Sequence, residues 1–282
     1  MPEPVVDLHA HTTASDGSLR PARLVQRAAE AGLAALAVTD HDTVDGLAEA
    51  REEAGRAGIE LVNGMELSVK WGDGTFHMLG YLFEEGPALD AGLAGLKGIR
   101  QERNEKMIRK LNELGFPVTT EEVVAASGGG QVGRPHMAKA LVARGYFPTV
   151  DAAFATLLRK GRPAYVTVER LEPEGAIALI HEARGVAVLG HPYQLKLDAA
   201  ALDAQVAGLK RAGLDGIEVQ HSNHDPERQS LYESLARKYD LAGTGGSDFH
   251  GDVKPDIRLG RAWGGAPIPL SRLDDLKRRL RR

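Results

Sequence analysis

The sequence predicts an α/β protein, a distorted (β/α) barrel of about seven strands with an all-helical insertion. Strand-like and helix-like stretches alternate up to about residue 96 and again after residue 163, whereas the stretch between them has only a helical pattern. Repeated strand–helix units imply parallel strands with right-handed crossovers, and about seven or eight such strands fit a closed barrel better than an open sheet. We therefore assign residues 1–96 and 164–282 to the barrel, and residues 97–163 to the insertion.

The first part of the predicted barrel holds four strand signals and two helix signals. After the short apolar run at residues 5–6, a helix is expected over residues 18–30, with Ser18 as its cap. The run "LAALAV" predicts a strand, and a second helix is expected over residues 44–57. The runs "IELVNGMELSV" and "TFHMLGYLF" predict two strands paired across a turn at residues 72–74.

The insertion begins with an apolar stripe at helical spacing, formed by Met107, Ile108, Leu111 and Leu114. Three more helical stretches follow, "TEEVVAAS", "RPHMAKALVARG" and "TVDAAFATLLRK". Alternation then resumes with a strand in "AYVTV", a helix in "EGAIALIHEARG", and strands in "VAVLG", "GIEVQ" and "LAGTGGSDFH".

Composition narrows the possible chemistry. Among 282 residues, 43% are hydrophobic and 26% charged, as in a soluble globular protein, and there is no cysteine. Disulfides, thiolate metal sites and cysteine nucleophiles are therefore excluded, and any metal must be held by histidine and carboxylate. No apolar run approaches a membrane span and no signal peptide is evident, so we expect a cytoplasmic protein that does not bind membranes and needs no obligate protein partner.

Charge is divided unevenly along the chain. Residues 97–163 hold twelve Lys or Arg against six Asp or Glu, a net +6, which leaves −10 for the rest of the chain. A basic insertion in an acidic body suggests an anionic ligand held between them, although a solvated basic helix face is an equally good explanation of the charge alone.

The stretch "DLHAHTTASDG" places two histidines one residue apart at the end of the first predicted strand. Residues i and i+2 of a strand point to the same face, so His9 and His11 would aim at one point to which Asp16 can return. Two ordinary surface histidines would give the same pattern. The signal becomes specific because residues able to bind metal also lie in or at the end of other predicted strands. The complete set is His9, His11, Asp16, His41, Glu66, His77, His191, Asp248 and His250.

Strand ends of a parallel barrel open on one rim, where the active sites of such barrels lie. Nine ligands are too many for one ion, and three ions, with a carboxylate bridging two of them, fit more naturally than two. Imidazole and carboxylate suit Zn, Mn or Fe rather than Mg or Ca.

The motifs "DLHAHTTASDGS", "VTDHDTVDG", "GMELSV", "LGHP" and "GSDFH" resemble those of the PHP (polymerase and histidinol phosphatase) superfamily. The helical insertion with "GRPHMAKAL" is similar to the branch that contains the 3',5'-nucleoside bisphosphate phosphatases and the 5'-to-3' exoribonuclease RNase AM. The resemblance implies a metal-dependent phosphoesterase that acts on a small anionic nucleotide, of the 3',5'-bisphosphate type, and on short single-stranded 5'-phosphorylated RNA.

By the same resemblance, His9, His11, Glu66 and Asp248 would hold one ion. The second ion would share Glu66 and add His77 and His191, and the third would take Asp16, His41 and His250. A bridging hydroxide would then attack phosphorus in line, with no covalent enzyme intermediate.

The substrate-binding residues are expected in the insertion. Arg134 and His136 are spaced like the family's phosphate-binding pair, and Arg162 could join them. Arg103 could contribute, although an exposed helix charge explains it more simply. Asp7, Asp40 and Asp42 flank ligands and would orient histidine rings, while His221 and His224 could line the rim. None of these last five residues is expected to bind metal.

Other functions fit parts of the pattern. An amidohydrolase also uses a barrel, a His-x-His pair and a late Asp, but it typically needs a bridging lysine where this chain has Glu66. The run "LAVTDHDTV" contains the Asp-x-Asp of aspartyl-phosphate phosphatases, which do not require the histidine set. A histidinol-phosphate or sugar-phosphate phosphatase remains open within the same fold. A non-hydrolytic metal-binding module would be expected to have lost ligands, and none is lost here.

Overall fold

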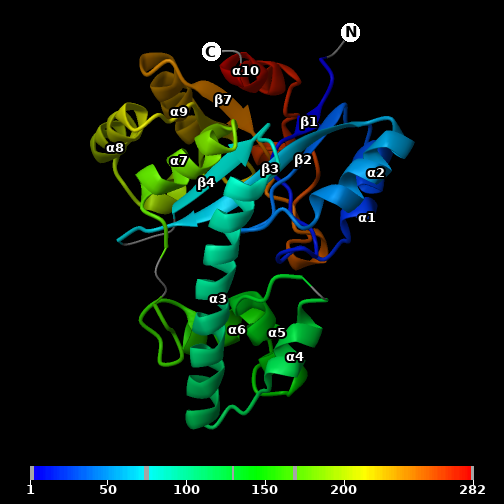
Figure 1. The fold of residues 1–282 in the computed structure, drawn as a ribbon, viewed down its shortest axis with the longest axis vertical. Coiled ribbons are helices and arrows are strands. Elements are labelled where there is room, and N and C mark those ends of the chain that lie inside the picture. Colours follow the sequence, from blue (N-terminus) through cyan, green and yellow to red (C-terminus); the bar gives the residue numbers. More distant parts are fainter. Residues whose placement is uncertain (1–2, 73–75, 129, 168–169, 281–282) are drawn as a thin grey trace.

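The structure is a computed structural model that describes residues 3–72, 76–128, 130–167 and 170–280. Figure 1 shows a lobe of strands and helices above a smaller helical lobe, with the long helix α3 (Pro87–Glu113) running from one into the other. Both ends of the chain lie at the far end of the larger lobe.

Seven strands form one sheet in chain order, so each strand lies beside the next. They are β1 (Val6–Asp7), β2 (Ala35–Val38), β3 (Glu60–Val69), β4 (Phe76–Tyr81), β5 (Val186–Gly190), β6 (Gly216–Gln220) and β7 (Ala242–Gly245). Strand β4 is antiparallel to β3 and β5, and the other neighbouring pairs are parallel.

The sheet closes almost completely between its first and last strands. The backbone N–H of Leu8 donates to Gly245 O at 3.2 Å, that of Asp248 donates to His9 O at 2.9 Å, and Ala10 bridges Phe249. These contacts join the chain just beyond β1 to the chain at and beyond β7. The distorted barrel predicted from the sequence is confirmed, and the closure brings the two ends of the strand series to one place.

Helices cover the outside of the barrel because its strands are apolar on both faces. The helices of the larger lobe are α1 (Pro21–Glu30), α2 (Leu47–Ala57), α7 (Pro173–Glu182), α8 (Ala199–Arg211), α9 (Pro226–Lys238) and α10 (Ser271–Leu280). The smaller lobe holds α4 (Thr120–Ala126), α5 (Arg134–Ala143) and α6 (Val150–Ala153), the last continued by a π-helical turn at Phe154–Leu158. None of the described helices has the length and apolar content that a membrane crossing needs.

Helix α3 belongs to both hydrophobic cores. Its first part contributes Leu89 and Leu93 to the core of the larger lobe, and its second part contributes Met107 and Leu111 to the core of the smaller lobe. The helix begins ten residues before the position expected for the insertion. Packing at both ends therefore fixes the basic face of α3 relative to the rim of the barrel.

Two local predictions were wrong. Helix α1 begins after Arg20 without a side-chain cap, because the Ser18 hydroxyl accepts from the backbone N–H of Asp252 at 2.8 Å instead. The predicted strand "AYVTV" has no strand structure over residues 164–167, and residue 168 lies outside the described residues. Ala164 and Val166 pack in the core of the smaller lobe, and β3 bridges Leu171 rather than this segment. The antiparallel pairing of β3 with β4 is confirmed, although residues 73–74 of the predicted turn are outside the described residues.

Candidate metal centre

The barrel brings all nine predicted metal-ligand residues to one rim. His9 and His11 follow β1, His41 follows β2, and His191 directly follows β5. His77 is the second residue of β4, and because β4 runs antiparallel to its neighbours its beginning lies at the same rim. Asp16, Glu66, Asp248 and His250 complete the set, and every member contacts at least one other.

Glu66 lies at the centre of the cluster, within reach of five imidazoles. Its Oε2 atom lies 3.3 Å from His9 Nε2, 3.1 Å from His11 Nε2 and 3.2 Å from His41 Nδ1. Its Oε1 atom lies 2.5 Å from His77 Nδ1 and 2.8 Å from His191 Nε2. Burial opposes ionisation of Glu66, but the imidazoles of His77, His41 and His9 hold the pKa of this carboxyl well below its usual range.

Two aspartates extend the cluster on either side of His11. Asp16 Oδ1 lies 3.3 Å from His250 Nε2, and Asp16 Oδ2 lies 3.8 Å from His41 Nε2. Asp248 Oδ1 lies 3.4 Å from His11 Nε2 and 3.5 Å from His250 Nδ1. A carboxylate therefore stands between imidazoles from different strands at each side, as a shared centre of several ions requires.

Unpaired buried nitrogens test whether the cluster fits metal ions. Both ring nitrogens of His11, Nδ1 of His41 and Nδ1 of His191 are buried without a well-aligned hydrogen bond, although Glu66 Oε2 lies 3.1 and 3.2 Å from two of them. Buried polar atoms without partners are costly, and metal coordination would satisfy the nitrogens that face the cluster. Three groups within the nine residues have ligand atoms close enough to share an ion: His11, Asp16, His41 and His250; His9, His11 and Glu66; and His41, Glu66 and His77. A fourth group joins His9 to two residues outside the nine, Glu218 and His221. The donor set therefore fits metal binding.

The backbone is strained where the rim is built. Asp42, His191 and Asp248 adopt positive φ angles of 53°, 23° and 59°. Residues other than glycine seldom adopt this region, and such conformations persist where the surroundings impose them, often at functional sites. His191 and Asp248 are predicted metal ligands, and Asp42 forms an ion pair with Arg100.

The aspartates that flank the ligands brace the backbone rather than the imidazole rings, which corrects the sequence-based expectation. Asp7 accepts the backbone N–H groups of His9, Ser247 and Gly260, at 3.1, 2.9 and 2.7 Å. Asp40 accepts the backbone N–H of Thr12 at 2.8 Å. Among their described hydrogen bonds, none goes to a histidine ring, because these side chains point away from the rim into the turns that carry the ligands.

Glu218, in β6, has the ring-orienting role that the sequence did not reveal. Its Oε1 atom lies 2.9 Å from His9 Nδ1, and its Oε2 atom accepts the backbone N–H of His191 at 2.7 Å. The only sequence signal was a single acidic residue inside the otherwise apolar run "GIEVQ". A glutamate buried in a strand needs a partner, and this one has two predicted ligands.

His221 and Lys254 both approach Asp248. The Nδ1 atom of His221 accepts the backbone N–H of Asn223 at 3.0 Å, and the Nε2 atom lies 3.6 Å from Asp248 Oδ2. His221 Nε2 thus faces Asp248, at a distance too long for a hydrogen bond. Lys254 Nζ lies 2.6 Å from the same oxygen, which leaves Asp248 Oδ1 to face the imidazoles. His224 turns away and bonds Val219 O.

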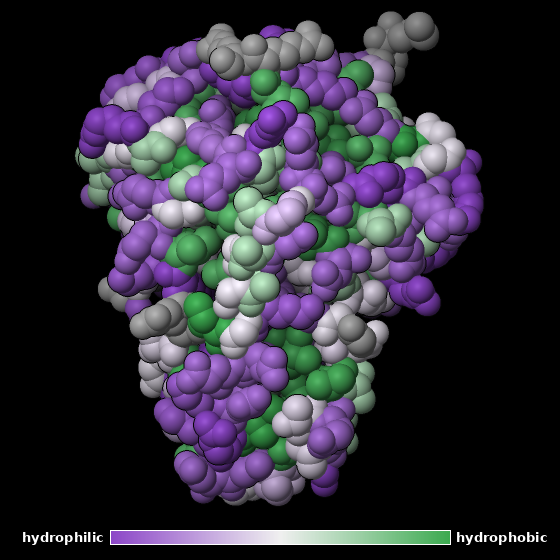
Figure 2. Space-filling model, in the orientation of Figure 1, coloured by the Kyte–Doolittle hydropathy of each residue, from purple (hydrophilic) through white to green (hydrophobic). Residues whose placement is uncertain are grey.

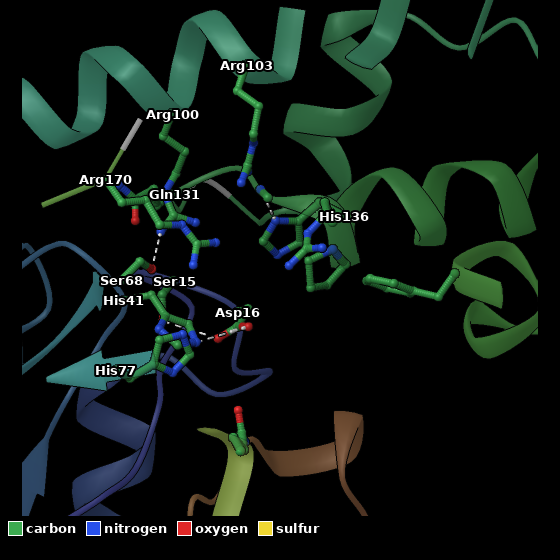
Figure 3. A pocket seen from close by; sticks show the side chains of 15 residues that line it. Ser15, Asp16, His41, Ser68, His77, Arg100, Arg103, Gln131, His136 and Arg170 are labelled. Atoms are coloured by element: carbon green, nitrogen blue, oxygen red, sulfur yellow. Dashed lines mark hydrogen bonds and ion pairs between the residues drawn. The ribbon is translucent and has the colours of Figure 1, made fainter. Parts of the chain in front are cut away.

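A pocket of about 220 Å³ lies between the metal-ligand cluster and the helical lobe. Asp16, His41 and His77 line one side (Figure 3). The opposite side carries basic and polar residues from α3, α5 and the segments around them. These are Arg100, Arg103, Gln131, Arg134, His136 and Arg170.

Four arginines crowd this pocket with little negative charge to balance them. Burial, reinforced by the neighbouring guanidinium groups, lowers the pKa of Arg100 to about 10 and that of Arg103 to about 9. Arg100 pairs with Asp42, but no carboxylate in the described residues forms an ion pair with Arg103, Arg134 or Arg170. Such a cluster is arranged for an anion that carries several charges.

His136 adds a neutral donor to the same pocket. Its Nδ1 atom accepts the backbone N–H of Gly133 at 3.0 Å, so its proton lies on Nε2. Burial lowers the pKa of His136 to about 4, which keeps the ring neutral near pH 7. Arg162, by contrast, is exposed and does not line the pocket, and Arg170 occupies the wall instead.

The comparisons with known proteins cover nearly the whole chain. The family model described as the PHP domain matches residues 7–196. The 5'-3' exoribonuclease Rnm of Salmonella typhimurium is 37% identical over 260 residues, which is 91% of this chain and 88% of the relative. The chain belongs to the PHP family.

Other relatives of this PHP protein have related names. The 3',5'-nucleoside bisphosphate phosphatase of Chromobacterium violaceum is 34% identical over 247 residues, 87% of each chain. A Bifidobacterium adolescentis protein thought to be a metal-dependent phosphoesterase matches 99% of this chain and 97% of its own, with a TM-score of 0.88 and 32% identity. A Chromobacterium violaceum structure called an amidohydrolase, with bound sulfate and no metal, has a TM-score of 0.85 and 32% identity, over 97% and 96% of the two chains.

These comparisons confirm the family, the barrel fold and the enzyme class predicted from the motifs: this PHP protein is a phosphoesterase. The residues that sequence reasoning missed are Arg100, Gln131, Arg170, Glu218 and Lys254. Arg170 in particular follows the predicted insertion, in an irregular segment with no motif.

Proposed function

We propose that this PHP protein hydrolyses nucleotides that carry two phosphate groups, of the 3',5'-nucleoside bisphosphate type, and shortens 5'-phosphorylated RNA from its 5' end. The observation that carries the proposal is that Asp16, His41 and His77 line the same pocket as four arginines. One phosphate group would meet the metal-ligand cluster and the other the arginines. A substrate with one phosphate would leave one of these two regions without its ionic partner.

Three divalent ions would be shared among the nine clustered residues. His9, His11, Glu66 and Asp248 would hold one ion, Glu66, His77 and His191 a second, and Asp16, His41 and His250 a third. Histidine and carboxylate donors suit Mn, Zn or Fe. When bound, the ions would polarise the phosphoryl oxygens and make a water molecule acidic enough to act as a nucleophile near neutral pH.

The protein's own side chains would position the second phosphate. Arg103, Arg134 and Arg170 offer guanidinium groups that have no carboxylate partner within the described part of the chain, and His136 offers its Nε2–H. Arg100 is held in place by Asp42 and by the Ser68 hydroxyl, which fixes one edge of the pocket. The second phosphate would therefore enter a preorganised, positively charged site, and its binding would place the scissile ester at the rim.

The same pocket argues against the alternative functions. A histidinol-phosphate or sugar-phosphate phosphatase needs charge for one phosphate group only, and an amidohydrolase needs no cluster of arginines. Four crowded guanidinium groups instead favour a substrate with charge at two places. A cytoplasmic location and action without an obligate protein partner stay predictions.

Elemental analysis of the purified protein, combined with a substrate panel, tests the proposal. The panel compares adenosine 3',5'-bisphosphate, adenosine 3'-monophosphate and a short 5'-phosphorylated RNA, each with and without chelator. We expect about three equivalents of transition metal per chain, and hydrolysis of the bisphosphate and the RNA that chelator abolishes. Equal rates on the monophosphate and bisphosphate would contradict the role of the arginines. A metal content near zero after growth with Mn and Zn would contradict the metal centre.

A further inference from the structure

A second hollow, of about 250 Å³, is lined by α3, α4 and residues 130–132. Ile108 of α3 and Val123, Val124 and Val132 give it apolar walls. Figure 2 shows apolar residues gathered beside α3 in the helical lobe, between purple charged surfaces. We call this hollow the α3–α4 groove.

The α3–α4 groove adjoins the substrate pocket. Arg100 and Gln131 line both cavities, so the two share a wall that lies beside the arginine cluster. A nucleotide whose phosphate is held by that cluster would therefore lie next to the groove. The groove is therefore in a position to bind the base of the nucleotide.

Gln131 places a carboxamide at the wall that the groove shares with the substrate pocket. Both its Oε1 and Nε2 atoms are buried, and neither has a hydrogen-bond partner. A buried carboxamide that is left unpaired is costly, so these atoms point to a ligand with a complementary donor and acceptor. The edge of a nucleobase has this pattern, and adenine presents N6–H and N7 to an amide in a two-bond pairing.

We propose that the α3–α4 groove is a nucleobase site, in which Gln131 bonds the edge of the base and the valines and Ile108 cover its faces. The proposal rests on the proposed nucleotide function and extends it, since it assigns the base of the same nucleotide to a separate part of the insertion. Adenine is the base that Gln131 matches best. The helical insertion therefore distinguishes a nucleotide from a sugar bisphosphate, and not only one charge pattern from another.

Binding of the reaction products to the metal-loaded full-length protein tests this site. Isothermal calorimetry compares adenosine 5'-monophosphate with ribose 5-phosphate, which has an anomeric hydroxyl in place of the base. We expect adenosine 5'-monophosphate to bind about tenfold more tightly, as burial of the faces of one base would give. Equal affinities in the wild-type protein would overturn the nucleobase site.

Val124→Trp fills the groove and leaves every arginine of the chain in place, and Leu114→Trp is its matched control. Both residues lie in the helical lobe and are exposed to a similar degree, 44% and 42%, but Leu114 is outside the groove. Val124→Trp is expected to remove most of the preference for the base, whereas Leu114→Trp is expected to keep it. A Val124→Trp protein with an unchanged affinity ratio would overturn the proposal.

Gln131→Leu gives a second measurement that does not depend on filling the groove. It removes the carbonyl and amino groups of the carboxamide at similar side-chain size. We therefore expect the preference for adenosine 5'-monophosphate over uridine 5'-monophosphate to disappear. Failure of the base site and failure of the proposed reaction are distinct. If the protein prefers adenosine 5'-monophosphate over ribose 5-phosphate but hydrolyses no phosphate ester, the base site is supported and the proposed reaction is contradicted. If it hydrolyses a bisphosphate but binds both products equally well, the reaction is supported and the base site is contradicted.

Discussion

Glu218 Oε1 lies 2.9 Å from His9 Nδ1, and this contact turns the other ring nitrogen of His9 toward Glu66. Both side chains are fully buried. Burial opposes ionisation of Glu218, but the nearby His9 ring lowers the pKa of Glu218 to about 2, so the carboxylate stays charged at any pH where the protein works. A strand that is distant in sequence, but close in space once the barrel closes, thus sets the orientation of a ligand that follows the first strand.

Glu218→Gln is expected to weaken metal binding. The amide keeps the shape of the side chain but loses the charge that orients His9, and the loss of such a partner typically costs about 10- to 100-fold in metal affinity. Competition with a chelating dye measures the change. Glu182→Gln, on the exposed face of α7, is the matched control and should bind metal like the wild type. Unchanged affinity in Glu218→Gln would mean that this carboxylate only fills space.

Arg134→Ala is expected to weaken binding of adenosine 3',5'-bisphosphate at least about tenfold, because a hydrogen bond to a charged group contributes roughly 1.5–3 kcal/mol. Metal content should stay the same, since Arg134 contacts none of the nine clustered residues and packs over the Tyr165 ring. Arg109→Ala removes the same charge from the exposed face of α3. If the two variants bind the bisphosphate equally well, Arg134 does not hold a phosphate.

His136→Gln is expected to flatten the pH dependence of stability. The folded-state pKa of about 4 lies below the value of 6.5 for a free histidine, so the unfolded chain takes up a proton that the folded chain does not. The wild type therefore loses stability as the pH falls from about 6.5 to about 4, by up to about 3 kcal/mol. Urea unfolding of chelator-treated protein at pH 7 and pH 5 measures this loss. A variant with the same loss as the wild type would contradict the shift in the pKa of His136.

Gly246→Ala is expected to destabilise the protein and disturb the metal centre together. A Cβ atom at position 246 would collide with the Cβ and backbone nitrogen of His9, and overpacking of this kind typically costs about 1–3 kcal/mol. Thermal unfolding and metal content are the two measurements. Gly95→Ala is the control, because its Cβ would meet only open space and alanine favours the helix by about 1 kcal/mol. Normal metal content in Gly246→Ala would show that the end of β1 can shift freely.

The order of the strands and the nine clustered residues were predictable because both depend on local patterns repeated along the chain. Apolar runs mark the strands, and parallel strands bring their ends to one rim whatever the distance in sequence. Even His77, in the one strand that runs the other way, lies at that rim, since it is near the beginning of its strand. The expectation for Arg134 and His136 came from a motif rather than from periodicity, and the structure places both in the pocket.

The partners of those residues were not predictable, because they depend on how elements pack. Glu218 reaches His9 only because the sheet curves until its last strands meet its first. Helix α3 packs on the barrel at Leu89 and on the smaller lobe at Leu111, and this packing fixes where the chain returns to the barrel. Arg170 therefore lines the pocket, whereas Arg162 is exposed. Residue order encodes strand ends through short-range periodicity, whereas contacts between distant side chains exist only once helices and strands have packed.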